Sequence, residues 1–190
     1  PRRIARWPVA CDTVRVNPVT SLVPAAAERL GVAARVVGFT DADAALVRAT
    51  AAPVAAACEA AAAAVYDHLL SVPETAKWFL RSDGTPDERA LAERRRTLAN
   101  WLALVASADL SEETARALSR IGRVHAASTS TPAGPVPAAF LVATTAFAQA
   151  AVAGVLREAL GPERALDASI AWNKLFMLHL DLMLAGYGAG

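Results

Sequence analysis

Apolar residues recur every three or four positions along most of the chain, and no stretch shows sustained alternation of apolar and polar residues. A helical period, about 3.6 residues per turn, predicts amphipathic helices, whereas alternation would predict half-buried strands. The pattern therefore predicts an all-α fold with seven or eight helices and short connections. No internal repeat is visible in it.

Capping residues and prolines divide this pattern into separate helices. Thr40 precedes two acidic residues, and Ser111 precedes Glu112 and Glu113, which is typical of a helix N-cap with acids in the first turn. A glycine–proline pair at 161–162 separates two long helices at the end of the chain. The helices expected from these signals span residues 25–37, 40–51, 53–70, 74–80, 86–105, 112–127, 137–159 and 163–186.

Composition supports one helical domain after an irregular start. The chain has 190 residues, about one domain, and 47 of them are alanine, the residue that favours helix most. Four prolines fall within residues 1–24, which predicts an irregular N-terminal extension there and a helical domain over 25–190.

Charge and cysteine content exclude several classes of function. Nineteen basic and 18 acidic residues leave a net charge of +1, which argues against binding nucleic acid or an anionic membrane through bulk charge. Cys11 and Cys58 are too few and too far apart for a disulfide framework or a structural zinc site. No CxxCH motif occurs, so a covalently attached c-type haem is excluded. No signal peptide is recognisable, and we expect a cytoplasmic protein.

One stretch, residues 136–156, contains no charged residue and is long enough to cross a bilayer. It consists mostly of alanine, includes threonine, glutamine and glycine, and has no flanking basic cluster. We interpret it as a buried helix of a soluble bundle.

His125 is the first candidate for chemistry. On a helix it shares a face with Ile121, Leu118 and Thr114, so its imidazole lies within an apolar stripe and needs a partner. The partner is either a backbone carbonyl, which would make it a core histidine, or a metal such as a haem iron. Gly122 destabilises the same helix, and the close approach of a flat group would explain it.

Tyr66 is the second candidate, because its phenol follows a run of alanines near the end of a helix. It either packs with its hydroxyl toward solvent or backbone, or donates a hydrogen bond to a ligand in a pocket. Of the other two histidines, we expect His68 to lie on the surface. We expect His179 to lie in the core or in an interface. The arginine run at 94–96 is typical of a solvated helix face.

The residues around both candidates resemble a known family. The segments 66–75, YDHLLSVPET, and 120–125, RIGRVH, resemble the globin domains of globin-coupled sensors. The N-terminal extension, Trp101, the long loop after His125 and the Ala-Trp pair at 171–172 are similar to single-domain protoglobins. The chain ends soon after Tyr187, which favours that second branch. Two places depart from it: Val65 stands where single-domain relatives usually carry tryptophan, and segment 137–140 is smaller than in relatives.

This resemblance implies a globin-like helical sandwich that binds haem b (iron protoporphyrin IX) non-covalently. It implies that His125 is the proximal iron ligand and that Tyr66 lies on the distal side, near a diatomic gas such as O2, CO or NO. The apolar pocket walls, assigned from helical spacing, are Phe79, Leu98, Leu102, Val105, Leu118, Ile121 and Phe147.

Three functions remain open at this point. The favoured one is a gas binder or gas sensor; the others are a haem enzyme acting on peroxide, nitrite or nitric oxide or in carbene- and nitrene-type chemistry, and a haem-free interaction module. The last two helices carry more large apolar residues, among them Trp172, Phe176 and Met183, than one small core needs. A homodimer through these helices is therefore expected, and the family implies one as well.

Overall fold

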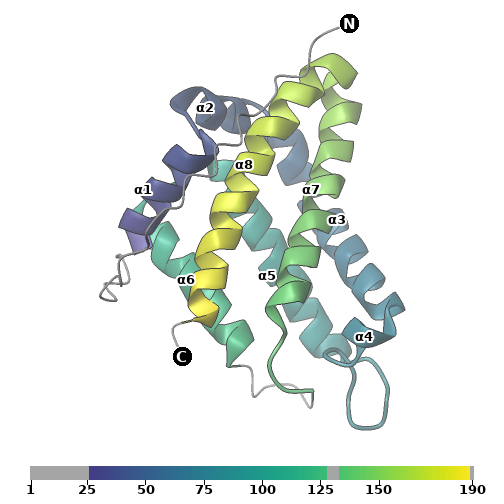
Figure 1. The fold of residues 1–190 in the computed structure, drawn as a ribbon. Coiled ribbons are helices and arrows are strands. Elements are labelled where there is room, and N and C mark those ends of the chain that lie inside the picture. Colours follow the sequence, from purple (N-terminus) through teal and green to yellow (C-terminus); the bar gives the residue numbers. More distant parts are fainter. Residues whose placement is uncertain (1–25, 128–132, 189–190) are drawn as a thin grey trace, which may run out of the picture.

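The computed structural model of the chain describes residues 26–127 and 133–188. These residues form an all-α structure (Figure 1), in which the one β-type pairing is an isolated bridge between Leu80 and Pro86. The predicted extension at 1–24 and part of the predicted loop lie outside the described residues, so the domain boundary stays a prediction. The helices are α1 (Ala26–Val37), α2 (Asp41–Ala49), α3 (Ala51–Ser71), α4 (Pro73–Ala76), α5 (Glu88–Ser107), α6 (Glu112–Ala126), α7 (Ala138–Leu160) and α8 (Pro162–Tyr187).

The structure confirms the expected helices, with ends shifted by at most two residues in all but one case. The exception is α4, which was expected to reach residue 80 and ends at Ala76. Beyond it the amides of Trp78 and Phe79 bond to carbonyls three residues back, at 3.3 and 2.8 Å, so the chain continues in tight turns.

Both predicted N-caps are present. The Thr40 hydroxyl accepts a bond from the Asp43 amide at 3.3 Å, and the Asp43 carboxylate accepts one from the Thr40 amide at 2.8 Å, which completes a capping box. The Ser111 hydroxyl accepts from the Thr114 amide at 3.2 Å and begins α6. Local side-chain chemistry therefore sets where α2 and α6 begin.

Helix α8 forms the centre of the packing. It contacts α6 and α7 along much of its length and also packs on α1 and α2, while α3 packs on α5 and α7 (Figure 1). Its side chains Trp172, Leu175 and Phe176 are completely buried. The Trp172 indole also donates to the Thr50 hydroxyl at 2.9 Å, which ties α8 to the joint between α2 and α3.

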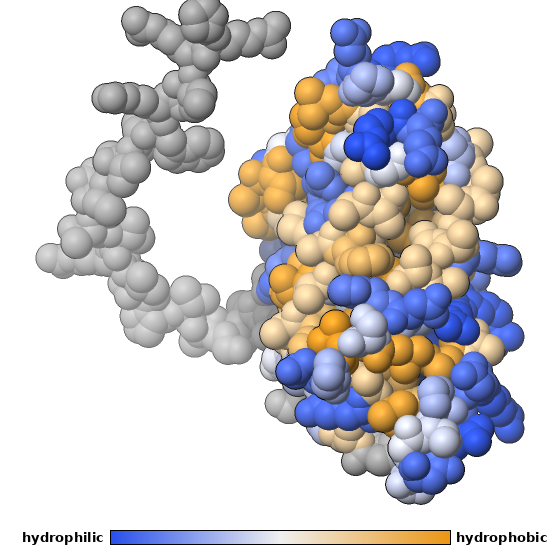
Figure 2. Space-filling model, turned by 90° about the vertical axis from the view of Figure 1, so that its right-hand side faces the viewer, coloured by the Kyte–Doolittle hydropathy of each residue, from blue (hydrophilic) through white to orange (hydrophobic). Residues whose placement is uncertain are grey.

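Helix α7 corrects one expectation. It is long and apolar enough to cross a membrane, but only 22% of its most apolar window is buried, so it is not the buried helix that the sequence suggested. Only one stripe is buried: Thr145, Ala148, Val152 and Leu156. Its other faces carry many exposed alanines, as does α3, and Figure 2 shows pale apolar residues between charged ones on this side of the molecule. Alanine raises hydropathy without requiring burial, and one such helix is weak evidence for a membrane span.

Candidate functional site

His125 lies in the last turn of α6 and is half-buried. Its Nδ1 is 2.8 Å from the carbonyl oxygen of Ile121, one turn earlier. A carbonyl can only accept, so Nδ1 carries the proton, and in the neutral ring Nε2 then carries the lone pair. This carbonyl is the partner that the core-histidine interpretation predicts, and a histidine that ligates a metal through Nε2 can make the same bond at Nδ1. Among the described residues Nε2 has no hydrogen-bond partner, which leaves it available as a ligand atom.

Tyr66 lies near the end of α3, with its ring edge-to-face with Phe79 at a centroid distance of 5.5 Å. Its hydroxyl makes no hydrogen bond to a described residue. Burial raises the pKa of this phenol to about 12, although the positive charges of Arg94 and Arg95 act in the opposite direction. The hydroxyl therefore stays protonated at any physiological pH and can act as a donor.

The sequence suggested that the arginine run on α5 forms a solvated helix face, but two of its three arginines have partners on other elements. Arg94 is half-buried, donates to the Trp78 carbonyl at 2.7 Å and lies over the Phe79 ring at 5.1 Å. Arg95 pairs with Asp67 at 2.7 Å, so only Arg96 follows the expectation. The sequence could not reveal this, because the partners come from α3 and the turn after α4.

The proposed wall residues fall into two groups. Leu102, Val105 and Leu118 are completely buried in the core. Phe79, Leu98, Ile121 and Phe147 are only partly buried, as are His125 and Tyr66 themselves. The Phe147 ring is stacked on His68 at 4.9 Å. The half-buried set comes from α3, α5, α6, α7 and the turn after α4, and its members are the side chains that a ligand could still reach.

The two candidate side chains belong to different parts of the packing. Within residues 26–127 and 133–188, α6 packs on α8 and α1, and it makes no comparable contact with α3 or α5. Helices α3 and α5 instead pack on each other. An imidazole with a free nitrogen and a phenol donor thus come from helices that are not in close mutual contact, with partly buried apolar side chains around both.

The structure explains the glycine at position 122 differently from the sequence analysis. A Cβ there would overlap the Met183 carbonyl oxygen of α8 and would lie 3.2 Å from the Gly186 Cα. The close approach that requires glycine is therefore that of another helix backbone, not of a flat ligand. The same crossing requires Gly186, whose Cβ would lie 2.7 Å from the Arg123 amide nitrogen.

The other two histidines lie where the sequence placed them. His68 is exposed, and His179 is completely buried on α8 near Trp101, with a ring-centroid distance of 6.3 Å. Neither ring nitrogen of His179 has a hydrogen-bond partner among the described residues. Burial lowers its pKa to about 4, so it is neutral at physiological pH.

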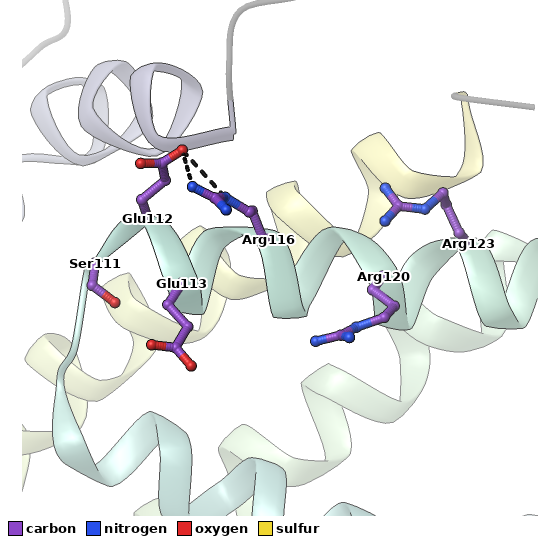
Figure 3. Close-up of a pocket in the computed structure, with 6 residues that line it drawn as sticks. All are labelled: Ser111, Glu112, Glu113, Arg116, Arg120 and Arg123. Carbon is purple, nitrogen blue, oxygen red and sulfur yellow. Dashed lines mark hydrogen bonds and ion pairs between the residues drawn. The ribbon is translucent and has the colours of Figure 1, made fainter.

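A hollow on the outer side of α6 is separate from these side chains. Figure 3 shows the residues that line it, all at the start of α6 or along its outer face. Arg116, Arg120 and Arg123 are exposed there. Glu112 neutralises Arg116 through an ion pair.

Two further residues, Val136 and Tyr187, are linked to the backbone of His125 by hydrogen bonds. The Tyr187 hydroxyl donates to the Val136 carbonyl at 3.0 Å, and the Val136 amide donates to the His125 carbonyl at 3.1 Å. No sequence signal links positions 125, 136 and 187, apart from the general expectation that a half-buried tyrosine hydroxyl finds a partner.

Comparison with solved structures defines the class of the fold. The globin domain of a globin-coupled sensor from Geobacter sulfurreducens is similar, with a TM-score of 0.69 and 23% sequence identity over 83% of this chain and 96% of that one. The fold is therefore that of a globin.

The family model for protoglobins matches residues 26–189, and the chain belongs to the protoglobin family. No curated protein matches the sequence. Family and fold together support a globin-type role in gas binding or gas sensing.

Proposed function

We propose that the chain binds haem b non-covalently through His125 and takes up a diatomic gas. The observation that carries this proposal is the hydrogen bonding of the imidazole: Nδ1 lies 2.8 Å from the Ile121 carbonyl oxygen, and Nε2 has no protein partner among the described residues. Haem ligation by neutral histidine through Nε2 needs the tautomer protonated at Nδ1, with that nitrogen oriented by a carbonyl. When bound, haem would supply an iron that can bind a gas.

The remaining side chains have complementary tasks. The Ile121 carbonyl sets the plane of the His125 ring, and Tyr66 holds a proton toward a gas in the pocket. Phe79, Leu98 and Ile121 present apolar surface that excludes water. A neutral gas such as CO needs only this apolar space, whereas a polarised ligand such as O2 is also stabilised by a phenol donor.

The test is substitution of His125 by alanine. We expect His125→Ala to lose haem or to hold it loosely, with exogenous imidazole restoring part of the Soret absorption. Glu59→Ala is the control, because Glu59 is exposed on α3, and the substitution should leave the spectrum unchanged. Full haem retention in His125→Ala would remove His125 from the role. A wild-type chain that stays colourless after haemin is added would indicate a haem-free module.

We also propose that the chain forms a homodimer, through one exposed side of α8 and the adjoining α1 rather than through the two C-terminal helices together. Trp172, Phe176 and Met183 are used by the core of a single chain. Large apolar side chains remain exposed along one side of α8, however: Leu166 at 63%, Ile170 at 47% and Met177 at 38%. Next to Met177, Val32 and Val36 of α1 line an apolar groove.

A second copy of the chain is the occupant that this surface fits, since the exposed residues continue from α8 onto α1. Ile170→Arg should shift the mass measured by light scattering from dimer to monomer. Arg48→Glu, an exposed change on α2, is the control. A monomeric wild type at micromolar concentration would contradict the proposal.

A further inference from the structure

The end of α6 that carries His125 is fixed on α8 by direct backbone contact. Gly122, one turn before His125, faces the Met183 carbonyl, and Gly186 faces the backbone of Ser119 and Arg123. A side chain at either glycine would overlap the opposite helix. The two helices therefore cross without intervening side chains, directly before the imidazole on one and before Tyr187 on the other.

A pair of hydrogen bonds continues this contact to His125 itself. Tyr187, the last residue of α8, donates its hydroxyl to the Val136 carbonyl at 3.0 Å. The amide of Val136 in turn donates to the His125 carbonyl at 3.1 Å. From the other side the Trp78 indole donates to the Gly134 carbonyl at 3.1 Å, so the segment before α7 is held at two points.

The His125 carbonyl needs such a partner. The last four carbonyls of a helix lack intrahelical donors, and helix ends fray when nothing replaces them. His125 is the penultimate residue of α6, so its carbonyl is one of these four. The Val136 amide supplies the missing donor, and Tyr187 holds Val136 in place.

We propose that Tyr187 is a positioning residue for His125: through Val136, its hydroxyl fixes the backbone from which the imidazole projects. This inference rests on the proposed role of His125 as a haem ligand. It assigns a role in orienting the imidazole to a residue 62 positions further along the chain. It also links the end of α8 to the last turn of α6, which carries His125.

Tyr187→Phe removes only the hydroxyl. We expect haem transfer to an excess of apomyoglobin to become about three- to ten-fold faster, in the range of one lost hydrogen bond. The iron–histidine stretching band of the reduced, gas-free protein should shift or broaden, because it reports on the imidazole rather than on overall stability. Hydrogen exchange at the Val136 amide should become faster.

Ser119→Ala is the matched control, because it removes a hydroxyl bond to the Leu182 carbonyl, 3.4 Å, in the same helix pair without touching Val136. It should leave the band and the Val136 exchange rate unchanged. The inference alone is overturned if Tyr187→Phe matches wild type in all three measurements while His125→Ala loses haem. If His125→Ala keeps its haem, the proposed function fails and this inference fails with it.

Discussion

Near His125 the backbone of α6 lies directly on that of α8, while on the other side Tyr66 of α3, Phe79 of the turn after α4 and Leu98 of α5 are only half-buried. The first region has its glycines in contact and its helix end hydrogen-bonded. The second has a phenol without a hydrogen-bond partner among the described residues and an edge-to-face ring pair. The difference indicates that the imidazole side is built to hold one geometry, whereas the phenol side can adapt to what enters.

The largest effect should come from the helix crossing. Gly122→Ala places a Cβ into the Met183 carbonyl and should lower the free energy of unfolding by about 3–5 kcal/mol, measured by denaturant titration. Gly154→Ala is the control, because nothing lies within 4 Å of its Cβ position. That substitution should stabilise the protein by about 0.5–1 kcal/mol. Similar values for the two variants would show that the crossing is not rigid.

The second effect tests burial on the α8 side. Burial lowers the pKa of His179 from 6.5 to about 4, so below pH 6.5 the unfolded chain takes up a proton that the folded protein cannot bind. Stability should therefore fall by about 3 kcal/mol between pH 6.5 and 4 on account of this residue. His179→Leu should flatten this part of the pH profile. Parallel profiles for variant and wild type would contradict the prediction.

The third effect tests the phenol side. Tyr66→Phe should speed O2 dissociation by the equivalent of about 1.5–3 kcal/mol, since a bond to a charged acceptor is lost. The CO dissociation rate serves as the internal control and should change little. Equal off-rates for O2 in the variant and in wild type, measured by stopped flow, would mean that the hydroxyl does not reach the ligand.

The smallest effect should come from the far end of α6. Ser111→Ala removes an N-cap bond to Thr114 and should cost about 1 kcal/mol of stability. Because the crossing at Gly122 holds the other end, we expect the iron–histidine band to stay unchanged. A shifted band would show that α6 moves as a whole and that its two ends are not independent.

The caps show which features a sequence can predict. Thr40 and Ser111 bond to amides three residues away, so a local pattern contains all the information that was needed. The helical periodicity and the segment around His125 likewise gave the fold and the family. These predictions succeeded because the residues that interact are close together along the chain.

Predictions about distant partners were less successful. Gly122 was assigned to a flat ligand because no local signal indicates that α8 crosses there. Arg94 and Arg95 were expected on a solvated face, but their partners lie on other elements, Trp78 and Phe79 for Arg94 and Asp67 for Arg95. The role of each candidate side chain in the site stays a prediction, and the variants above are its test.

The alanine faces of α3 and α7 have a thermal consequence. Both helices are apolar by composition, yet much of their surface already meets water in the folded state. Unfolding therefore exposes less new apolar area than the 55% hydrophobic content suggests. Since newly hydrated apolar area dominates the heat-capacity change, that change should be small and the stability curve broad. Calorimetry would then show a protein that loses little stability on cooling.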